Sequence, residues 1–192
     1  AQFTPPYSLF SKKDYKSLYE SSSRADREEL YRWIEYYKIK FKSRVYTPLN
    51  NSEKYTLVLM GRADFGLLGS YNKYKQTPFE TFHVGGDGMT GSYTYATETI
   101  GLRGYDNGAL TPYSDGRAYT RFSMELHFPF LLQPSSTIYG LAFVEGGNAW
   151  TSLENFNPFS LKRSAGVGVR IFLPMIGLMG IDWAYGFDKV QG

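Results

Sequence analysis

The sequence predicts an all-β protein: an antiparallel, up-and-down segment of a transmembrane β-barrel. Along several stretches of about ten residues, apolar and polar side chains alternate, which indicates strands with one apolar face. The connections between these stretches are alternately short and long. Outer-membrane barrels have this asymmetry, with short turns at one end and long loops at the other. Strands of about ten residues also span the hydrocarbon layer at the tilt of a barrel.

Six stretches have the period of two that is expected for full strands. In the first of them, Ile39 and Phe41 alternate with Lys40 and Lys42. The six predicted strands cover Tyr37 to Tyr46, Tyr55 to Leu68, Ala118 to Phe128, Thr137 to Gly147, Arg163 to Leu173 and Leu178 to Phe187. The stretch PFLLQPSS is expected to form the turn after the third of these strands. A strand stump is expected near the start of the chain.

Six strands are too few to close a transmembrane barrel, for which eight is the usual minimum. Open edges in lipid would leave unpaired backbone groups at a cost of several kcal/mol each. The chain begins AQFTPPY, without an initiator methionine or a signal peptide. We therefore expect it to be a segment of a larger barrel.

The composition agrees with strands and excludes several classes of function. The 192 residues include 17 Tyr, 14 Phe and 20 Gly, which favour strands and turns. No apolar run approaches the roughly 20 residues of a membrane-spanning helix. The net charge of +3, without a dense basic stripe, argues against nucleic acid as a partner. The absence of cysteine excludes disulfides and thiolate metal sites but leaves the compartment open.

The long segment before the first full strand contains one helical pattern. Apolar residues recur there at helical spacing: Leu30, Trp33, Ile34 and Tyr37. Ser23, followed by Asp26, resembles a capping box. We predict a short amphipathic helix that packs the loop against the strand ends, with recognition of a partner as the alternative.

The sequence offers little for catalysis. It has no G-x-S-x-G, H-E-x-x-H or G-x-x-x-x-G-K motif, and His83 and His127 lack a metal-ligand spacing. Ser123 and His127 share a strand face, as in an outer-membrane phospholipase, but this is more typical of ordinary lumen lining. The stretch VGGDGMTG lacks the carboxylates of a calcium loop, so we assign its glycines to tight turns. We predict no enzyme activity, no catalytic residue, no metal and no cofactor.

Several stretches, taken in order, resemble one known family. PFETFHVGG and IGLRGYDNG resemble the sixth extracellular loop of BamA-type outer-membrane assembly proteins. SMELHFP, FVEGGNAW, SAGVGVRIFLP and GIDWAYGF resemble the four barrel strands that follow that loop. The resemblance covers nearly the whole chain from Tyr37 onward. It implies the C-terminal part of a sixteen-stranded barrel that follows periplasmic POTRA domains in the chain.

The resemblance also implies how the chain is divided. Residues 1–192 would be one portion of a single outer-membrane barrel domain. Residues 1–36 would form a partial strand and a long extracellular loop with the predicted helix, and this loop is longer than those typical of the family. Residues 69–117 would form loop 6, which in the family folds back into the barrel lumen.

The tip of loop 6 carries the family motif Val-Arg-Gly-Phe/Tyr. Here it reads Leu102-Arg103-Gly104-Tyr105, with Leu in place of Val. In the family the arginine pairs with acidic residues on the inner wall of the barrel. A guanidinium held by carboxylates in a partly dry lumen would pin the loop, because breaking one partner of a buried pair can cost about 3–5 kcal/mol.

The positions that match the acidic partners are Glu125 and Glu145, the second of which is often Asp in the family. Alternation places Glu125 on a polar face. Both faces of the stretch from Thr137 to Glu145 are largely apolar. Tyr139, Leu141 and Phe143 would share the inward face of Glu145. A bulge at Gly146-Gly147 would alter that assignment.

The resemblance implies a barrel that folds and inserts β-barrel proteins in the outer membrane of a Gram-negative bacterium. The expected partners are unfolded outer-membrane clients, accessory assembly lipoproteins, outer-membrane lipid, and the rest of its own barrel and POTRA domains. A secretion pore of the same superfamily, which translocates a soluble partner protein, is an alternative with the same arginine loop. A soluble β-domain that binds through its Tyr-rich surface is a third hypothesis.

Overall fold

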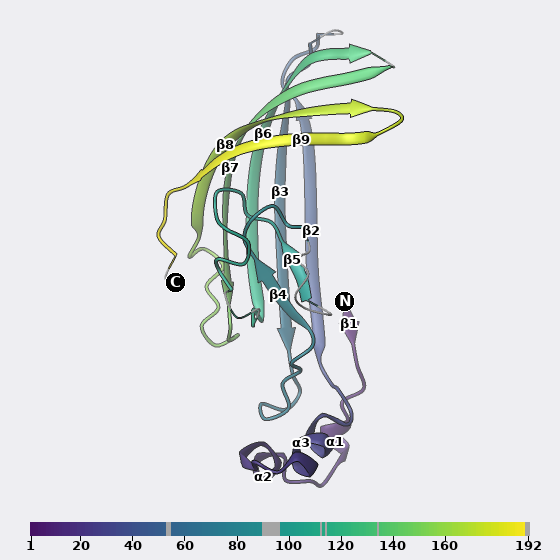
Figure 1. Ribbon diagram of the computed structural model, residues 1–192, viewed down its shortest axis with the longest axis vertical. Coiled ribbons are helices and arrows are strands. Elements are labelled where there is room, and N and C mark those ends of the chain that lie inside the picture. The colour runs from purple at the N-terminus through teal and green to yellow at the C-terminus, as the bar shows by residue number, and fades with distance from the viewer. Residues whose placement is uncertain (53–54, 90–96, 112, 114, 134, 191–192) are drawn as a thin grey trace.

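One large antiparallel sheet dominates the structure, a computed structural model that describes residues 1–52, 55–89, 97–111, 113, 115–133 and 135–190 (Figure 1). Within these residues, its strands follow the order β1-β2-β3-β6-β7-β8-β9. All neighbours in this sheet pair antiparallel, so the sheet is an up-and-down meander. Its strands are β1 (Gln2–Phe3), β2 (Tyr37–Pro48), β3 (Val58–Gly69), β6 (Ala118–Gln133), β7 (Ser136–Trp150), β8 (Lys162–Leu173) and β9 (Gly177–Gly186).

The predicted count is confirmed for the large sheet, with β1 as the stump and six full strands after it, whereas two short strands between β3 and β6 were not predicted. The end of the third full strand was predicted wrongly. Strand β6 continues through Pro129 to Gln133, with a register shift between Pro129 and Leu131. Proline has no amide to donate to a ladder, and the shift accommodates it without ending the strand. Pro134 of the expected turn lies outside the described residues.

Strand β3 begins at Val58, later than the predicted Tyr55. The Asn50 side chain explains the delay, because it takes over the backbone groups that would otherwise extend the ladder. Its Nδ2 donates to the carbonyl of Tyr55 at 3.0 Å, and its Oδ1 accepts from the amide of Leu57 at 2.7 Å. Glu53 and Lys54 of this turn lie outside the described residues.

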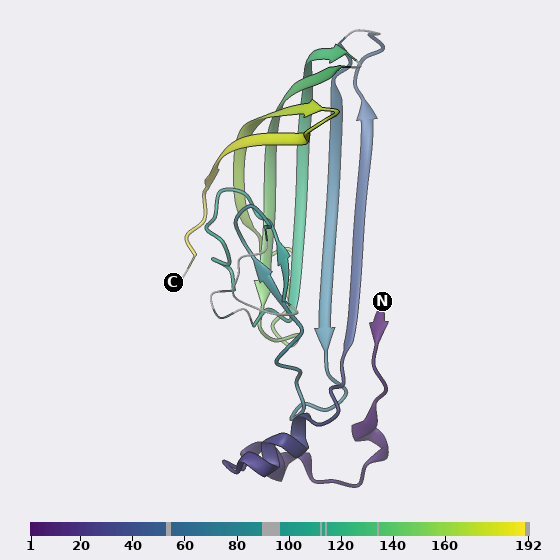
Figure 2. The same ribbon diagram turned by 45° about the vertical axis from the view of Figure 1, so that its right-hand side comes forward.

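Short and long connections lie at opposite ends of the sheet (Figures 1 and 2). The β2–β3, β6–β7 and β8–β9 connections gather at one end, which is the upper end in both views. The long segments before β2, between β3 and β6, and between β7 and β8 lie toward the other end. This is the asymmetry that the sequence predicted.

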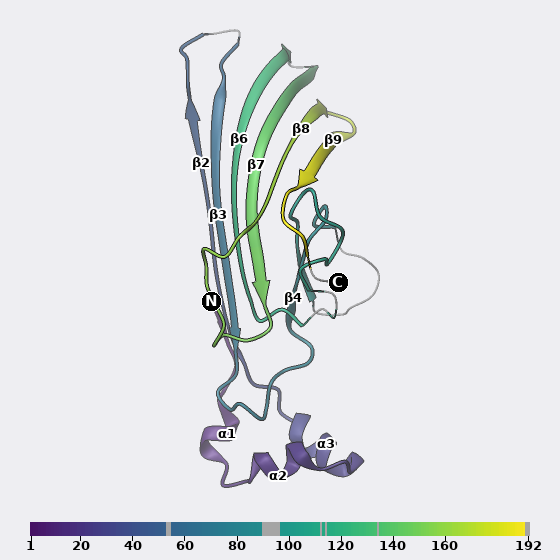
Figure 3. The same ribbon diagram turned by 90° about the vertical axis from the view of Figure 1, so that its left-hand side faces the viewer.

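The two faces of the sheet differ in polarity. Paired residues such as Phe41 and Phe65, or Val169 and Ile181, lie on the convex face, where large apolar side chains are exposed. The opposite face carries charged side chains, among them Asp64 and Arg121, which are buried. The β3–β6 connection lies on this concave face (Figure 3). The sheet is therefore apolar outside and polar inside.

The β3–β6 connection contains a small parallel sheet of its own, formed by β4 (Thr81–Val84) and β5 (Thr97–Ile100). Phe82 packs edge-on against Tyr119 of β6, with ring centroids 4.7 Å apart. The Tyr119 ring lies over Gly66, where an added Cβ would come within 2.7 Å of its Cδ1 atom. The loop thus shares a core with the wall, made of Tyr36, Leu68, Phe82, Val84, Ile100 and Tyr119.

The segment before β2 forms short helices: α1 (Tyr7–Phe10), α2 (Tyr15–Glu20) and α3 (Arg24–Tyr31). The predicted helix is present as α3, but it ends before Trp33 and Ile34, which are exposed. The two earlier helices are too short to show a period in the sequence. Among the described residues, none of the helices is long and apolar enough to cross a membrane.

The predicted capping box at the start of α3 is wrong. Ser23 is the N-cap residue, but its side chain makes no capping hydrogen bond in the described structure. The Asp26 carboxylate instead accepts a hydrogen bond of 2.5 Å from the hydroxyl of Ser21. The helix start is thus tied to the preceding turn rather than capped reciprocally.

Candidate functional site

The glycine-rich turn after β4 leads the loop to its tip. Gly85, Gly86 and Gly88 have φ values of 135°, 70° and 79°, which only glycine adopts readily. Thr90 and Gly91 of the same stretch lie outside the described residues. The carbonyl of Gly86 accepts from the amide of Leu102 at 3.0 Å, and the Leu102 side chain is fully buried. Leu102 thereby places the next residue, Arg103, against the wall.

The Arg103 guanidinium lies among carboxylates from three strands of the wall. Its Nη2 donates to Oε1 of Glu145 at 2.6 Å and also to Oε1 of Glu125. Its Nη1 lies 3.4 Å from Oδ2 of Asp182. The backbone amide of Arg103 donates to Oε2 of Glu145 at 3.0 Å. The guanidinium also stacks on the Phe143 ring, 3.5 Å from its centroid, so charge and shape both hold it.

Glu145 is the centre of this site, because its side chain is fully buried. Besides Arg103, its Oε1 accepts from Nη2 of Arg121 at 2.7 Å and from the hydroxyl of Ser123 at 3.0 Å. Two guanidinium groups and a hydroxyl thus replace the water that this carboxylate loses on burial. A buried charge is tolerated only with such partners.

The arginine stays charged in this site. Burial alone would lower the pKa of the Arg103 guanidinium, but the carboxylates of Glu145 and Glu125 outweigh it and raise that pKa above its ordinary value. The tip of the loop therefore carries a permanent positive charge, which the wall neutralises.

The structure brings together the residues named from the family motif, and it adds partners that the sequence analysis missed. Asp182 contacts both Arg103 and Arg170, and its Oδ1 lies 2.6 Å from Nη1 of Arg170. The alternation of β9 already placed Asp182 on the polar face, but nothing in the sequence related it to the loop. The face of Glu145 is as expected, since Phe143 is buried beside it.

The bulge considered at Gly146-Gly147 is not the feature that orients Glu145. Gly146 pairs with Phe122 and Gly147 with Arg121 in one continuous register, which continues on the other side of β7. Glycine is needed at position 147 for space, because an added Cβ would lie 2.9 Å from the carbonyl oxygen of Thr120. Close packing, not a bulge, explains this glycine.

The rest of the motif reaches the end of β9. Gly104 has a φ of 89°, and an added Cβ would lie 2.9 Å from the amide nitrogen of Gly186. The Tyr105 hydroxyl donates to the carbonyl of Arg163 at 2.7 Å and accepts from the amide of Asp188 at 3.3 Å. Hydrogen bonds from Arg163 lower the pKa of the Asp188 carboxyl to about 2. The loop tip therefore contacts β6, β7, β8 and β9.

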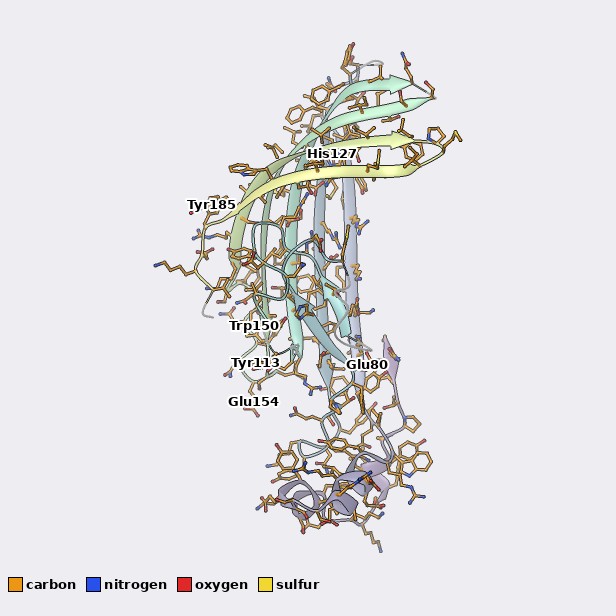
Figure 4. The ribbon with its side chains drawn as sticks, viewed as in Figure 1. Glu80, Tyr113, His127, Trp150, Glu154 and Tyr185 are labelled. Carbon is orange, nitrogen blue, oxygen red and sulfur yellow. The ribbon has the colours of Figure 1, made fainter. Side chains whose placement is uncertain are left out.

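A second set of ion pairs fixes the base of the loop. The Glu98 carboxylate lies 3.3, 2.9 and 3.3 Å from the ammonium groups of Lys38, Lys40 and Lys42 on β2. Lys38 also lies 2.9 Å from Glu80, which Figure 4 shows near the start of the loop. The alternation along β2 predicted the inward lysines, but their partners on the loop could not be predicted.

Ser123 and His127, the pair considered for catalysis, have other partners. The Ser123 hydroxyl donates to Glu145, and Nε2 of His127 lies 2.9 Å from Oε2 of Glu125. His127 lies toward the short-turn end of the sheet, away from Trp150 and Glu154 (Figure 4). Both side chains belong to the polar wall around the arginine site.

These features define a class of protein: a membrane β-barrel wall with a long loop anchored on its inner face. Residues 22–192 match the model of the Omp85 superfamily domain, so the chain belongs to the Omp85 superfamily. The fold is also similar to the crystal structure of BamA from Haemophilus ducreyi lacking POTRA domains 1–3, with a TM-score of 0.60 and 21% identity. That match covers 80% of this chain and 32% of the BamA chain. The predicted fold class and the resemblance to a BamA-type barrel are thereby confirmed.

Proposed function

We propose that this chain is a barrel segment of an outer-membrane protein insertase, which folds and inserts β-barrel proteins in the outer membrane of a Gram-negative bacterium. The loop tip, where Arg103 is bound by carboxylates of β6, β7 and β9, supports an anchored barrel wall, a feature that fits the insertases and the secretion pores of the superfamily alike. The observation that carries the insertase proposal is the similarity of the fold to a solved BamA barrel.

The proposed activity is non-covalent and uses no catalytic residue or cofactor. An open strand edge offers backbone donors and acceptors to an incoming strand. Such a template works only if the rest of the wall stays in place while the edge opens. In our proposal, the anchored loop keeps β6 to β9 together, and the clients are unfolded outer-membrane proteins. Accessory lipoproteins, outer-membrane lipid and POTRA domains of the same protein are further proposed partners.

The test uses the full-length protein that carries this chain, reconstituted in liposomes. We expect it to accelerate the folding of an unfolded client barrel, measured by the change in gel mobility on folding. Arg103→Ala should reduce the acceleration, whereas Arg24→Ala, the same change at an exposed side chain of α3, should leave it unchanged.

The alternative is a secretion pore of the same superfamily. In that case the reconstituted protein would leave the client folding rate unchanged and would let a soluble partner protein cross the liposome membrane. Protection of that partner from external protease would then reveal its passage. This result would replace the insertase proposal.

A further inference from the structure

An exposed apolar surface lies on the helical segment, beyond the ends of the strands. Leu9 and Phe10 of α1 are 65% and 84% exposed, and Trp33 is 56% exposed. Tyr7 joins them, since its ring lies 5.3 Å from that of Trp33. We call Tyr7, Leu9, Phe10 and Trp33 the aromatic patch. Several large apolar side chains exposed to water on one short segment are unfavourable and often mark a contact surface.

In the segment around the patch, polar side chains are buried and large apolar side chains are exposed. Ser8 and Glu35 are buried, and the amide of Ser8 donates to Oε2 of Glu35 at 2.8 Å. Thr4 and Tyr36 exchange hydrogen bonds beside them, with Thr4 N to Tyr36 O at 3.0 Å and Tyr36 N to Thr4 Oγ1 at 2.6 Å. Polar groups therefore hold α1 to the start of β2, while its apolar side chains point outward. This arrangement suits an apolar environment rather than water.

The apolar outer face of the sheet extends to the strand ends that lie next to α1. Phe3 pairs with Tyr37, and alternation along β2 places Tyr37 on the same face as Ile39 and Phe41. Helix α1 lies just beyond the ends of β1 and β2, whereas α2 and α3 extend toward the concave side (Figure 3). A strand of 12 residues spans the hydrocarbon layer at barrel tilt. Its Tyr37 end is therefore level with the bilayer surface, where Trp and Tyr concentrate.

We propose that the aromatic patch is an interfacial membrane anchor, which inserts into the headgroup–acyl boundary of the leaflet on the long-loop side. Close to the patch in the sequence lie the exposed Lys12 and Arg32, the second of which also lies 3.8 Å from Glu29. Their positive charges match the negative charge of lipid phosphates. The anchor fixes one end of the helical segment to the bilayer. The inference rests on the outer-membrane location in the proposed function.

The test measures the depth of single labelled positions in the full-length protein in liposomes. This chain has no cysteine, so Phe10→Cys can carry a fluorescent bimane label once any cysteines elsewhere in the protein are replaced. Phe41→Cys on the outer face of β2 and Glu20→Cys on the exposed end of α2 are the matched controls. Quenchers are lipids with a nitroxide near the headgroup or deep in the acyl chain, and iodide in the water.

We expect the label at position 10 to be quenched by the headgroup nitroxide, the label at 41 by the deep nitroxide, and the label at 20 by iodide. Quenching of position 10 by iodide alone would overturn the anchor. Protection of position 10 from both lipid and iodide would also overturn it, in favour of a protein partner on the patch. If position 41 escaped lipid quenching as well, the membrane location itself would be wrong, and the proposed function would fail with it.

Discussion

The two longest insertions, the helical segment before β2 and the loop between β3 and β6, leave the sheet at the same end and use charge in opposite ways. The loop folds onto the concave face and buries its key ion pair, with Arg103 13% and Glu145 0% exposed. The helical segment stays outside, and its pair of Arg24 and Glu28 is 92% and 68% exposed. Arginine and glutamate thus pair in a buried site on the loop and in a solvent-exposed site on the helical segment.

This difference in burial decides how much each ion pair contributes to the stability of the fold. An exposed pair contributes at most about 1 kcal/mol, because water and salt screen it. A buried pair contributes little beyond its desolvation cost, but loss of one partner leaves the other buried and unpaired, at about 3–5 kcal/mol. The loop is therefore far more sensitive to the loss of one ion-pair partner than the helical segment, whose ion pairs are largely exposed.

The largest effect is expected at the arginine of the loop tip. Arg103→Ala leaves Glu125 and Glu145 without their shared partner and should destabilise the folded barrel by about 3–5 kcal/mol. The measurement is the urea midpoint of unfolding in micelles, read from the gel mobility of the full-length protein. Arg24→Ala is the matched control, and equal midpoints for the two variants would contradict the anchoring role.

The two glutamates should differ in their effect. Glu145→Gln removes the charge that faces both Arg103 and Arg121, so we expect a loss of about 3 kcal/mol or more. Glu125→Gln should cost less, about 1–3 kcal/mol, because its side chain is 13% exposed whereas that of Glu145 is fully buried. Unfolding of both variants in urea gives the order, and the reverse order would show that Glu125 is the main partner.

The glycine of the motif should be replaceable only at a cost. Gly104→Ala places a Cβ where φ is 89° and where the backbone of Gly186 is 2.9 Å away. The strain of that conformation alone costs about 1–2 kcal/mol. Gly61→Ala is the control, because an added Cβ at Gly61 meets nothing within 4 Å. Both variants are compared by their unfolding midpoints, and similar values would contradict a close contact between the loop and β9.

Acid should loosen the base of the loop. Burial would raise the pKa of Glu98, but hydrogen bonding to Lys40 and the charges of Lys38 and Lys40 outweigh it and lower that pKa below its ordinary 4.5. Because the folded-state pKa is depressed, the stabilisation is present above pH 4.5 and is lost as the pH falls below it. Glu98→Gln should therefore destabilise the protein at neutral pH and have progressively less effect in acid. The measurement is the stability of the original protein and of the variant from neutral pH into acid. If the difference between them stayed constant, the ion pairs of Glu98 would not contribute to stability.

The smallest effect is expected in the helical segment. Lys13→Ala breaks the pair of Lys13 and Glu29 and should change the free energy of unfolding by no more than about 0.5 kcal/mol. About 1 M salt should remove even this difference, since screening at that concentration acts within about 3 Å. The measurement is the unfolding midpoint of the original protein and of Lys13→Ala, each at low and at high salt. A loss comparable to that of Arg103→Ala would show that ion pairs contribute equally to stability in the two regions.

The alternation of side chains predicted most of the fold. In a strand between lipid and lumen, every second side chain faces lipid and is apolar, and those in between face the lumen and are polar. It placed Lys40, Glu125 and Asp182 on the inner face without any knowledge of their partners. It was less accurate at strand ends, where a single side chain such as Asn50 or a register shift at Pro129 decides the outcome. The family motif pointed to Arg103 and to its matching positions on the wall.

By itself, then, the sequence determined the meander, its two unlike faces and the end at which the long segments emerge, because these depend on local periodicity. Only the tertiary structure decided which charges meet. The contacts of Arg103 with Asp182, of Glu145 with Arg121 and of Glu98 with three lysines join segments far apart in the chain. Such contacts depend on strand register and on the path of the loop, which no local pattern encodes. The exposure of the apolar side chains of α1 likewise depends on a tertiary contact, in which Ser8 is buried against Glu35.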